Sequence, residues 1–309
     1  MFDVVLRTII PILLLMGTGL LSRKLGILKS GDERILSAYV YYFALPALFF
    51  VNMTETKFTE ETLRFMLAGI SPVLVVLAIY ISLYLVFGFS KDILYLVVLS
   101  TIFGSLAFFG IPFITFAFPG TGEPVATLAA ASISVVSVTA SITALELYRL
   151  QQSEILTGLK LVAKRLSKNP LILSIFFGIL FSLVRIEIPT PIAQPLHMLG
   201  STTSTVAIFM LGVFLYGRKY ANLRKALKLS MLRIVFLPIL AFFTTTLLDL
   251  SSLERSTLIL MHSMPVAISM IILSERYDFY KETIASLILI SSLGAGLYLN
   301  LWLFLLGHY

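Results

Sequence analysis

Apolar stretches long enough to cross a lipid bilayer recur along the entire chain of 309 residues. A transmembrane helix needs about 20 consecutive, mostly apolar residues, because the hydrocarbon layer is roughly 30 Å thick. Only 13% of the residues are charged, about half the share found in soluble domains. The sequence therefore predicts one all-α membrane domain, residues 1–309, with ten transmembrane helices. The predicted spans are residues 2–21, 35–53, 63–88, 93–118, 124–147, 170–185, 192–216, 229–249, 255–275 and 283–306.

Basic residues concentrate in alternate loops between these spans. With Arg233 counted in the loop between spans seven and eight, 18 of the 23 Lys and Arg residues lie on one side of the membrane. The positive-inside rule assigns that side to the cytoplasm, so both termini are expected outside the cell membrane. Because the basic residues lie in short loops, we interpret the net charge of +7 as a topology signal and expect no nucleic-acid partner.

A short connector divides the spans into two sets of five. The first set occupies residues 1–149, a cytoplasmic linker occupies 150–169, and the second set occupies 170–309. Residues 154–168 of the linker have the pattern of an amphipathic helix that lies on the membrane surface. Its apolar face would carry Ile155, Leu159, Val162 and Leu166. Five is an odd number, so the two sets enter the membrane from opposite sides, which is the arrangement of inverted repeats in secondary transporters.

Spans four and nine, which correspond to each other in the two sets, both contain a helix-breaking residue near the centre. Span four carries Gly104, Gly110 and Pro112, and span nine carries Pro265. Proline removes a backbone donor and crowds the preceding turn, and glycine tolerates extended backbone. We expect both helices to open and to cross at mid-membrane. Their half-helix N-termini would then point at one cavity and favour an anion.

The alternative to a crossing is a plain kink at each proline, which membrane helices tolerate. The remaining prolines inside predicted spans are interpreted as kinks of this kind. They are Pro11, Pro46, Pro72 and Pro238.

Four segments resemble the auxin efflux carrier family, which includes the plant PIN proteins and prokaryotic carriers described as malonate or malate permeases. They are LSAYVYYFALPALFF at 36–50, FGIPF at 109–113, TVAIFMLGVFLYG at 205–217 and MPVAISMIILSERYD at 264–278. The resemblance implies the fold of the bile-acid symporter-like superfamily, with a scaffold of helices 1, 2, 6 and 7 and a transport domain of helices 3–5 and 8–10. It also implies an elevator-type motion and a homodimer formed through the scaffold.

The chain departs from the family pattern at three polar positions. The family's fourth helix has asparagine seven residues before the proline, where this chain has Ser105. Its ninth helix has asparagine four residues after the proline and Thr or Gln directly after it, where this chain has Ser269 and Val266. Whether the serines replace the asparagines functionally is left open. The predicted substrate-binding residues are Gly104, Ser105, Gly110, Pro112, His262, Pro265, Val266 and Ser269.

His262 lies one turn before Pro265 and is the candidate for carrying a proton or contacting an anion. The alternative is a hydrogen-bonded packing histidine. Spans 4, 5, 9 and 10 carry no Asp or Glu at mid-depth, which argues against cation exchange. We expect no cofactor and no metal site. Coupling to Na⁺, coupling to H⁺ and uniport all stay open.

The predicted function is a secondary carrier that moves a small organic anion, a carboxylate, through the cell membrane. Another small solute such as an amino acid, or a channel or sensor with the same fold, is the alternative. An intramembrane enzyme is not expected, because the chain has no H-E-x-x-H, no G-x-S-x-G and no acidic pair at mid-depth. The substrate and the choice between import and export are left open.

Overall fold

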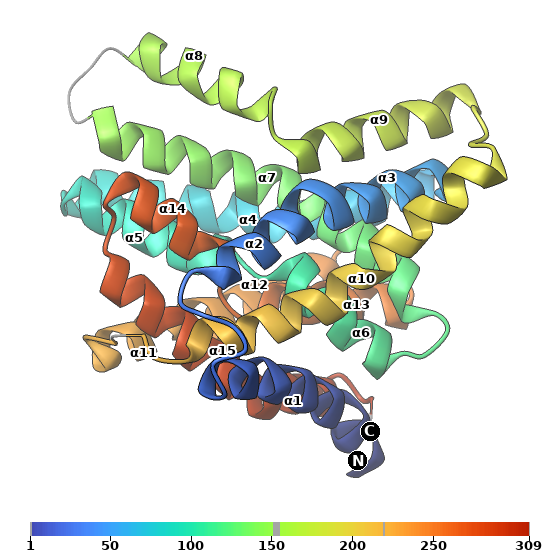
Figure 1. Ribbon diagram of the computed structural model, residues 1–309. Helices are drawn as coiled ribbons and strands as arrows, with labels where there is room; N and C mark the ends of the chain where they lie inside the picture. The colour runs from blue at the N-terminus through green and yellow to red at the C-terminus, as the bar shows by residue number, and fades with distance from the viewer. Residues whose placement is uncertain (1, 151–154, 219, 309) are drawn as a thin grey trace.

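The structure is a computed structural model that describes residues 2–150, 155–218 and 220–308 (Figure 1). Every regular element in those ranges is helical, which confirms the all-α prediction. Three of the elements, η1 to η3, are single turns of π-helix. In chain order the elements are α1 (Phe2–Lys24), α2 (Asp32–Tyr39), η1 (Val40–Ala44), α3 (Leu45–Glu55), α4 (Glu60–Phe87), α5 (Lys91–Ile102), η2 (Leu106–Gly110), α6 (Ile111–Ala117), α7 (Gly122–Leu150), α8 (Ile155–Leu166), α9 (Pro170–Val184), α10 (Thr190–Leu215), α11 (Leu223–Met231), η3 (Leu232–Phe236), α12 (Leu237–Thr246), α13 (Ser252–Ser263), α14 (Ser269–Tyr277) and α15 (Lys281–Leu305).

Seven helical stretches of the described chain are long and apolar enough to cross a membrane. They are Leu6–Lys24, Asp32–Glu55, Glu60–Phe87, Gly122–Arg149, Thr190–Leu215, Leu223–Thr246 and Lys281–Leu305. The other three predicted spans are short or interrupted. Helix α9 has 15 residues, which is too short to be counted as a membrane-spanning helix on its own. Together with Lys160–Leu166 of α8 it is long enough, but the two helices are bent by 65° relative to each other. Spans four and nine are each broken into pieces, so a multi-pass membrane protein is shown while the number of ten spans stays a prediction.

Each π-helical turn ends two residues before a proline. The three prolines are Pro46, Pro112 and Pro238, which occupy the second position of α3, α6 and α12. A π turn inserts one extra residue and thereby makes room for the proline ring and its missing donor. Pro11 and Pro72 instead lie inside the continuous helices α1 and α4. Two of the four prolines that we interpreted as plain kinks are thus preceded by a widened turn.

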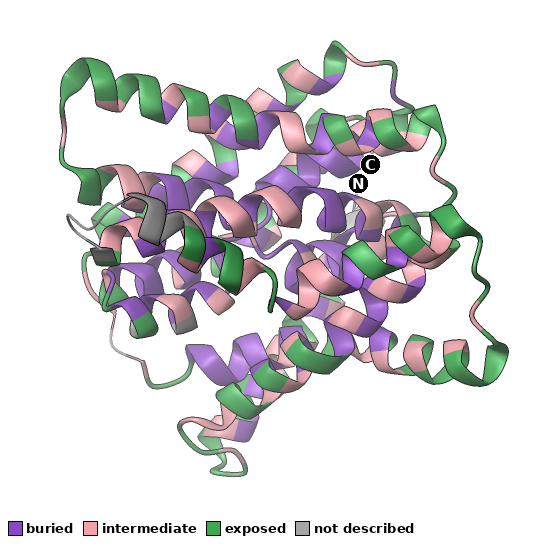
Figure 2. Ribbon diagram, turned by 90° about the horizontal axis from the view of Figure 1, so that it is seen from above, coloured by how far each residue is buried: buried purple, intermediate pink, exposed green. Residues whose placement is uncertain are grey.

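The helices pack in two groups. In the first group, α10 packs on α1, α2 and α3, and α3 packs on α9. In the second group, α7 packs on α4, α5 and α13, α12 packs on α4 and α13, and α11 packs on α15. Contacts between the groups run from α10 to η2, from α1 to α6 and α15, and from α3 to α7. Buried residues gather in the interior of the bundle and exposed residues on the peripheral helices (Figure 2).

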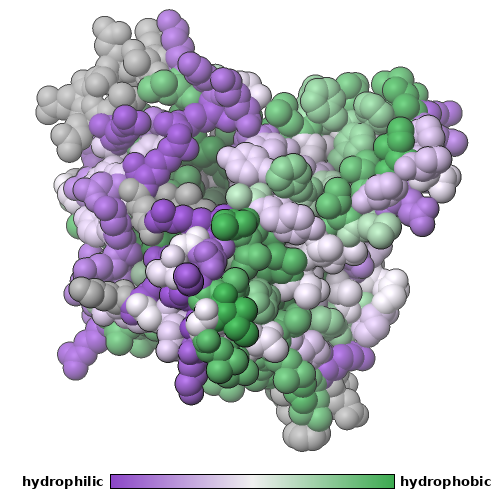
Figure 3. Space-filling view, in the orientation of Figure 1, coloured by the Kyte–Doolittle hydropathy of each residue, from purple (hydrophilic) through white to green (hydrophobic). Residues whose placement is uncertain are grey.

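Hydrophilic residues concentrate at one end of the molecule, to the left in Figure 3, where α8, α11 and the neighbouring ends of α5 and α14 lie. Helix α8 lies within the predicted amphipathic segment 154–168, of which Glu154 falls outside the described residues. Val162 is buried and Leu166 is half-buried, whereas the lysines at 160, 164 and 168 are exposed. Helix α8 is anchored by Arg165, which pairs with the buried Glu146 of α7.

Candidate functional site

The first break opens span four at residues 103–105. Helix α5 ends at Ile102, and Phe103 and Ser105 have φ/ψ values of −89°/76° and −78°/56°, outside the helical region. Helical structure resumes with η2 and continues through α6. The opening is therefore centred on Gly104, eight residues before Pro112. Of the helix-breaking residues named for span four, Gly104 rather than Pro112 marks the opening, because the proline is accommodated by the π turn that precedes it.

The second break opens span nine at residues 264–268. Helix α13 ends at Ser263, and Met264 is extended with φ −58° and ψ 148°. Helix α14 begins at Ser269. Pro265 lies inside this extended segment, as expected for a residue that cannot continue a helix.

The two opened segments pair with each other as a short antiparallel bridge between Gly104 and Val266. The Ser105 N–H donates to the Pro265 carbonyl at 2.7 Å, and the Ala267 N–H donates to the Phe103 carbonyl at 3.0 Å. Irregular backbone survives in a bilayer only when its polar groups are satisfied internally. The bridge supplies partners for both segments, so each break stabilises the other.

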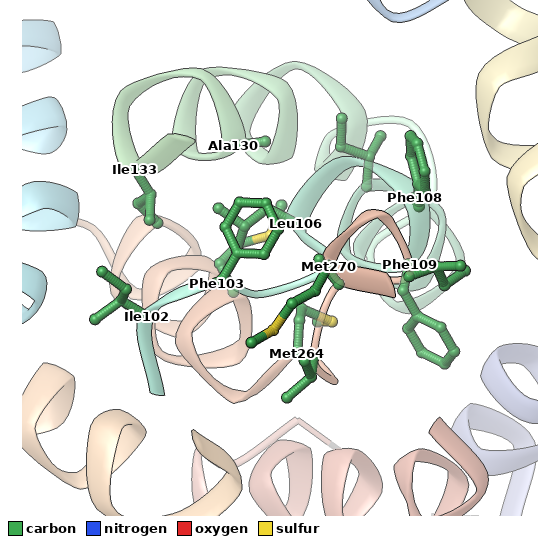
Figure 4. Packing of buried hydrophobic residues seen from close by; sticks show 14 of the residues in the cluster. Ile102, Phe103, Leu106, Phe108, Phe109, Ala130, Ile133, Met264 and Met270 are labelled. Carbon is green, nitrogen blue, oxygen red and sulfur yellow. The ribbon is translucent and has the colours of Figure 1, made fainter. Parts of the chain in front are cut away.

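Helix α15 and helix α7 close around this bridge. The Val266 N–H donates to the Ser291 hydroxyl of α15 at 3.1 Å, and that hydroxyl donates to the Leu287 carbonyl at 2.8 Å. Figure 4 shows the apolar packing: Phe103 and Leu106 from one broken helix and Met264 and Met270 from the other gather against α7. The opened backbone is therefore packed among apolar side chains.

Arg233 is fully buried in the π turn η3 and binds the ends of both broken helices. Its Nη1 donates to the carbonyls of Thr101 at 2.9 Å and Ile102 at 3.3 Å. Its Nε donates to the Met264 carbonyl at 2.9 Å, and its Nη2 to the Met261 carbonyl at 3.2 Å. These carbonyls form the C-terminal ends of α5 and α13, which carry partial negative charge and lack intrahelical donors. One guanidinium thus satisfies four carbonyls and offsets the charge of two helix ends.

The assignment of Arg233 to a cytoplasmic loop is wrong. The residue lies inside span eight, so the loops on the predicted cytoplasmic side hold 17 rather than 18 of the 23 Lys and Arg residues. Sequence reasoning missed its role, although a signal was present: Arg233 falls within the predicted span 229–249, and an ionisable residue inside a span points to function.

The glycines of span four allow neighbouring side chains to approach the backbone closely. A Cβ on Gly104 would lie 1.6 Å from Nη2 of Arg233, and a Cβ on Gly110 would lie 2.6 Å from Sδ of Met261. Any side chain at position 104 would displace the guanidinium from its carbonyls. Gly104 is therefore needed for the contact between the crossing segments and Arg233.

Arg233 binds the helix ends that precede the two breaks. The helix ends that follow the breaks are the N-terminal ends of η2 and α14. The first N–H groups of a helix have no partner within that helix and attract anions. Ser105 precedes η2 and Ser269 opens α14. The Ser105 hydroxyl is buried and has no hydrogen-bond partner in the described chain. Gly104 and Ser269 are partly exposed among buried neighbours.

The structure brings six of the eight predicted residues to the crossing and leaves two at its margin. Gly104, Ser105, Pro265 and Val266 form the bridge, Ser269 follows it, and Gly110 contacts Met261 of the partner helix. Pro112 is buried in α6, beyond the π turn. His262 is buried, and its Nε2 donates to the Gly69 carbonyl of α4 at 2.9 Å, which is the geometry of a packing histidine. Its Nδ1 has no partner in the described chain.

A cavity of about 380 Å³ lies between the two helix groups near α6. We call it the outer cavity because the predicted topology puts this end outside the cell. It is lined by Ala47, Leu48, Val51, Asn52, Thr115, Gly120, Glu123, Pro124, His197, Gly200 and Ser201. None of the eight predicted site residues lines this cavity, so the crossing is closed toward it in this conformation. Among the described residues, no group of three or more His, Cys, Asp or Glu side chains is placed to hold a metal ion.

The sequence matches known transporters over nearly its whole length. The family described as membrane transport protein matches residues 4–303. An uncharacterized transporter from Methanocaldococcus jannaschii is 25% identical over 313 residues, which cover 97% of each chain. The uncharacterized transporter YfdV from Escherichia coli K12 is 24% identical over 305 residues, or 96% of each chain. A proposed malonate transporter from Rhizobium meliloti is 25% identical over 134 residues, 43% of this chain and 42% of its own.

These matches confirm the resemblance to the auxin efflux carriers that the segments around Pro112 and Pro265 indicated. The family and the relatives are transporters, so the expectation that the chain is not an enzyme is confirmed as well. Because the family model matches residues 4–303, the chain belongs to the membrane transport protein family.

Proposed function

We propose that the protein is a secondary carrier that moves a small organic anion, a carboxylate, across the cell membrane. The observation that carries the proposal is the bridge between Gly104 and Val266, because it holds two helix N-termini side by side at one point. Helix N-termini favour negative charge, and Arg233 offsets the opposite, negative ends of the same broken helices. The name of the Rhizobium meliloti relative, a proposed malonate transporter, agrees with a carboxylate.

The carboxylate would bind where Gly104 and Ser269 are partly exposed at the crossing. The Ser105 and Ser269 hydroxyls and the first N–H groups of η2 would donate to its oxygens. The Met270 and Ile271 N–H groups of α14 already donate to the Ala267 and Ile268 carbonyls. The unpartnered Ser105 hydroxyl is a buried donor with no hydrogen bond in the described chain. A carboxylate that accepts this hydrogen bond removes the desolvation penalty of that group.

Transport would proceed by movement of the second helix group against the first. The first group holds the predicted scaffold helices 1, 2, 6 and 7, and the second holds the predicted transport domain with both breaks. The crossing touches the scaffold chiefly through η2 and α10, so a sliding motion would carry the bound anion past α10. We place both termini outside the cell. The exposed apolar face of α9 is the proposed surface for a homodimer, and it carries Phe176, Phe177, Leu180, Leu183 and Val184.

The test is uptake of labelled malonate by purified protein in liposomes under imposed Na⁺, H⁺ or voltage gradients. We expect saturable uptake that falls at least about tenfold in Ser105→Ala and Ser269→Ala, because a lost hydrogen bond to a charged group is worth about 1.5–3 kcal/mol. Ser167→Ala, on the exposed linker, is the control and should transport normally. Wild-type protein that moves no labelled carboxylate under any gradient would refute the proposal.

A further inference from the structure

A second cavity, of about 450 Å³, opens at the end of the molecule that we predict to be cytoplasmic. It lies between the helix groups, with α1, α2 and α10 on one side and α14 and α15 on the other. Its lining contains four basic residues, Arg23, Arg34, Arg218 and Lys281, and two acidic ones, Glu33 and Glu282. We refer to it as the basic vestibule.

The basic character of the vestibule is built into the scaffold. The Arg218 Nη2 donates to Glu33 Oε1 at 2.9 Å, and the guanidinium lies 4.1 Å from the centre of the Phe214 ring. The other Glu33 oxygen accepts the Gly31 N–H at 2.9 Å. Both carboxylate oxygens of Glu33 therefore accept hydrogen bonds, one from Arg218 and one from the backbone at Gly31. Lys281 also pairs with Asp278 at 2.6 Å. Four basic side chains against Glu33, Glu282 and Asp278 still leave the vestibule with a net positive charge.

A narrow throat continues from the vestibule toward the crossing. Glu33, Arg34, Phe214, Arg218 and Ile271 line both spaces, and the throat adds Ser37, Met210 and Ile268. Ile268 directly precedes Ser269 at the start of α14. The throat has a volume of only about 20 Å³, room for roughly one water molecule. In this conformation an organic anion fits in the vestibule and not beyond it.

The outer cavity has the opposite character. No Lys or Arg side chain is among its lining residues, and Glu123 contributes a negative charge. Its His197 is paired with Glu55 at 2.9 Å. The two entrances to the crossing therefore differ in electrostatic sign. Charge of one sign in a cleft with low-dielectric walls concentrates the oppositely charged solute there.

We propose that the basic vestibule is a separate binding site for small carboxylates, which loads the carrier preferentially from that side. The proposal rests on the proposed function for the role of the bound anion. Arg23, Arg34 and Lys281 lie at the mouth, where Lys281 also pairs with Asp278, and Arg218 lies at the throat in its pair with Glu33. The anion waits above the throat until Phe214 and Ile271 separate as α14 moves relative to α10.

The chain contains no cysteine, so single cysteines can report on each cavity without further changes. Ser30→Cys places a thiol in the vestibule, and Ser201→Cys places one in the outer cavity. The detergent-solubilised full chain is reacted with anionic sulfonatoethyl methanethiosulfonate and with its cationic trimethylammonioethyl analogue. We expect the ratio of anionic to cationic reaction rates to be at least about 5-fold higher for Ser30→Cys. Added salt should reduce the difference because it screens the charges.

Protection of the thiol by malonate then distinguishes a binding site from a general electrostatic attraction of anions to this end of the protein. Malonate should slow labelling of Ser30→Cys in a saturable manner and leave Ser201→Cys unaffected. Combining Ser30→Cys with Arg34→Gln and Lys281→Gln should abolish both the rate preference and the protection. Arg64→Gln, at the opposite end near Asp249, is the matched control and should change neither.

Equal rate ratios at the two positions, or no protection by malonate, would overturn the vestibule proposal. Protection by a short-chain phosphatidylglycerol without protection by malonate would also overturn it, because the site would then belong to lipid. The labelling does not depend on transport. Intact protection in a protein that moves no carboxylate would refute the proposed function and leave the vestibule standing.

Discussion

The two broken helices meet at one bridge but are opened in different ways. Span nine opens at its proline, because Pro265 lies within the extended segment 264–268. Span four opens at Gly104, and its proline lies eight residues further on, behind a π turn. A glycine that admits a buried guanidinium achieves in one helix what a proline achieves in the other. A proline in a membrane helix therefore does not by itself locate the break.

Arg233 makes the difference between the breaks possible. In span four it holds the carbonyls of Thr101 and Ile102, and in span nine those of Met261 and Met264. Span four has no proline at its break, so its open state depends on the donors of Arg233 and on the bridge. Span nine is already interrupted by Pro265, and Arg233 satisfies the carbonyls that the interruption leaves free.

The largest expected effect comes from removing the guanidinium. Arg233→Met removes a donor from four buried carbonyls. Those of Ile102 and Met261 still accept the Gly104 and Met264 N–H groups. Those of Thr101 and Met264 lose the guanidinium bonds at 2.9 Å, at a cost of about 1–3 kcal/mol each. We expect the free energy of unfolding to fall by more than about 3 kcal/mol and transport to be lost. Arg233→Lys, which keeps the charge with fewer donors, should fall between wild type and Arg233→Met. Thermal unfolding in detergent measures the loss of stability, and uptake of labelled malonate in liposomes measures the loss of transport.

Arg64→Met is the control for Arg233. Arg64 pairs with the fully exposed Asp249 at 3.8 Å, so its loss should leave the unfolding temperature unchanged. If Arg233→Met unfolds at the wild-type temperature, the carbonyl contacts do not stabilise the crossing.

The next effect is expected at Gly104. Gly104→Ala places a methyl group 1.6 Å from Nη2 of Arg233 and forces the guanidinium away from the carbonyls of span four. Overpacking of this kind costs about 1–3 kcal/mol, and we expect transport below about one tenth of wild type. Gly294→Ala is the control, since its nearest neighbour, on Tyr298, is at an ordinary 3.5 Å. Equal stability and transport in the two variants would show that span four does not depend on this contact.

The prolines test the comparison directly. Pro265→Ala lets the extended segment of span nine become helical, and we expect transport to fall about tenfold, or about 1.4 kcal/mol. Pro112→Ala restores a backbone donor in α6 but leaves the break at Gly104 in place, so transport should stay within about threefold of wild type. Uptake in liposomes checks both. A Pro112→Ala defect as large as that of Pro265→Ala would contradict the distinction between the two breaks.

The smallest effect is expected from the hydroxyls of α15. Ser291→Ala removes the acceptor of the buried Val266 N–H, with an expected cost of about 1 kcal/mol in the free energy of unfolding. Ser292 is a matched control because its buried hydroxyl has no hydrogen-bond partner in the described chain. Ser292→Ala should be neutral or slightly stabilising. Thermal unfolding that ranks the two variants in the reverse order would show that Val266 finds another acceptor.

The positions of most helices follow from local pattern. Helix α4, predicted at 63–88, is found at Glu60–Phe87, and α15, predicted at 283–306, is found at Lys281–Leu305. Runs of apolar residues end at charged residues and caps, which the sequence displays. The position of the break in span four could not be read in this way, because Gly104 and Pro112 are both helix-breaking residues and only packing chooses between them.

The partners of His262 and Arg233 also escaped local reasoning. Both lie in apolar surroundings within predicted spans, and helical spacing does not say which neighbouring helix a side chain meets. His262 turns toward Gly69 of α4, and Arg233 turns toward the crossing. The choice depends on how α4, α12 and α13 pack together.

The sequence alone established a membrane protein, its family and the two helices that break, because apolar run length and the residues Gly and Pro act over a few positions. Which residues contact the two breaks is decided by the tertiary structure. Gly104 meets Val266, and Arg233 reaches both helix ends, only when three distant segments are brought together. Buried backbone groups must find donors and acceptors wherever the fold places them, and that placement is a property of the whole bundle.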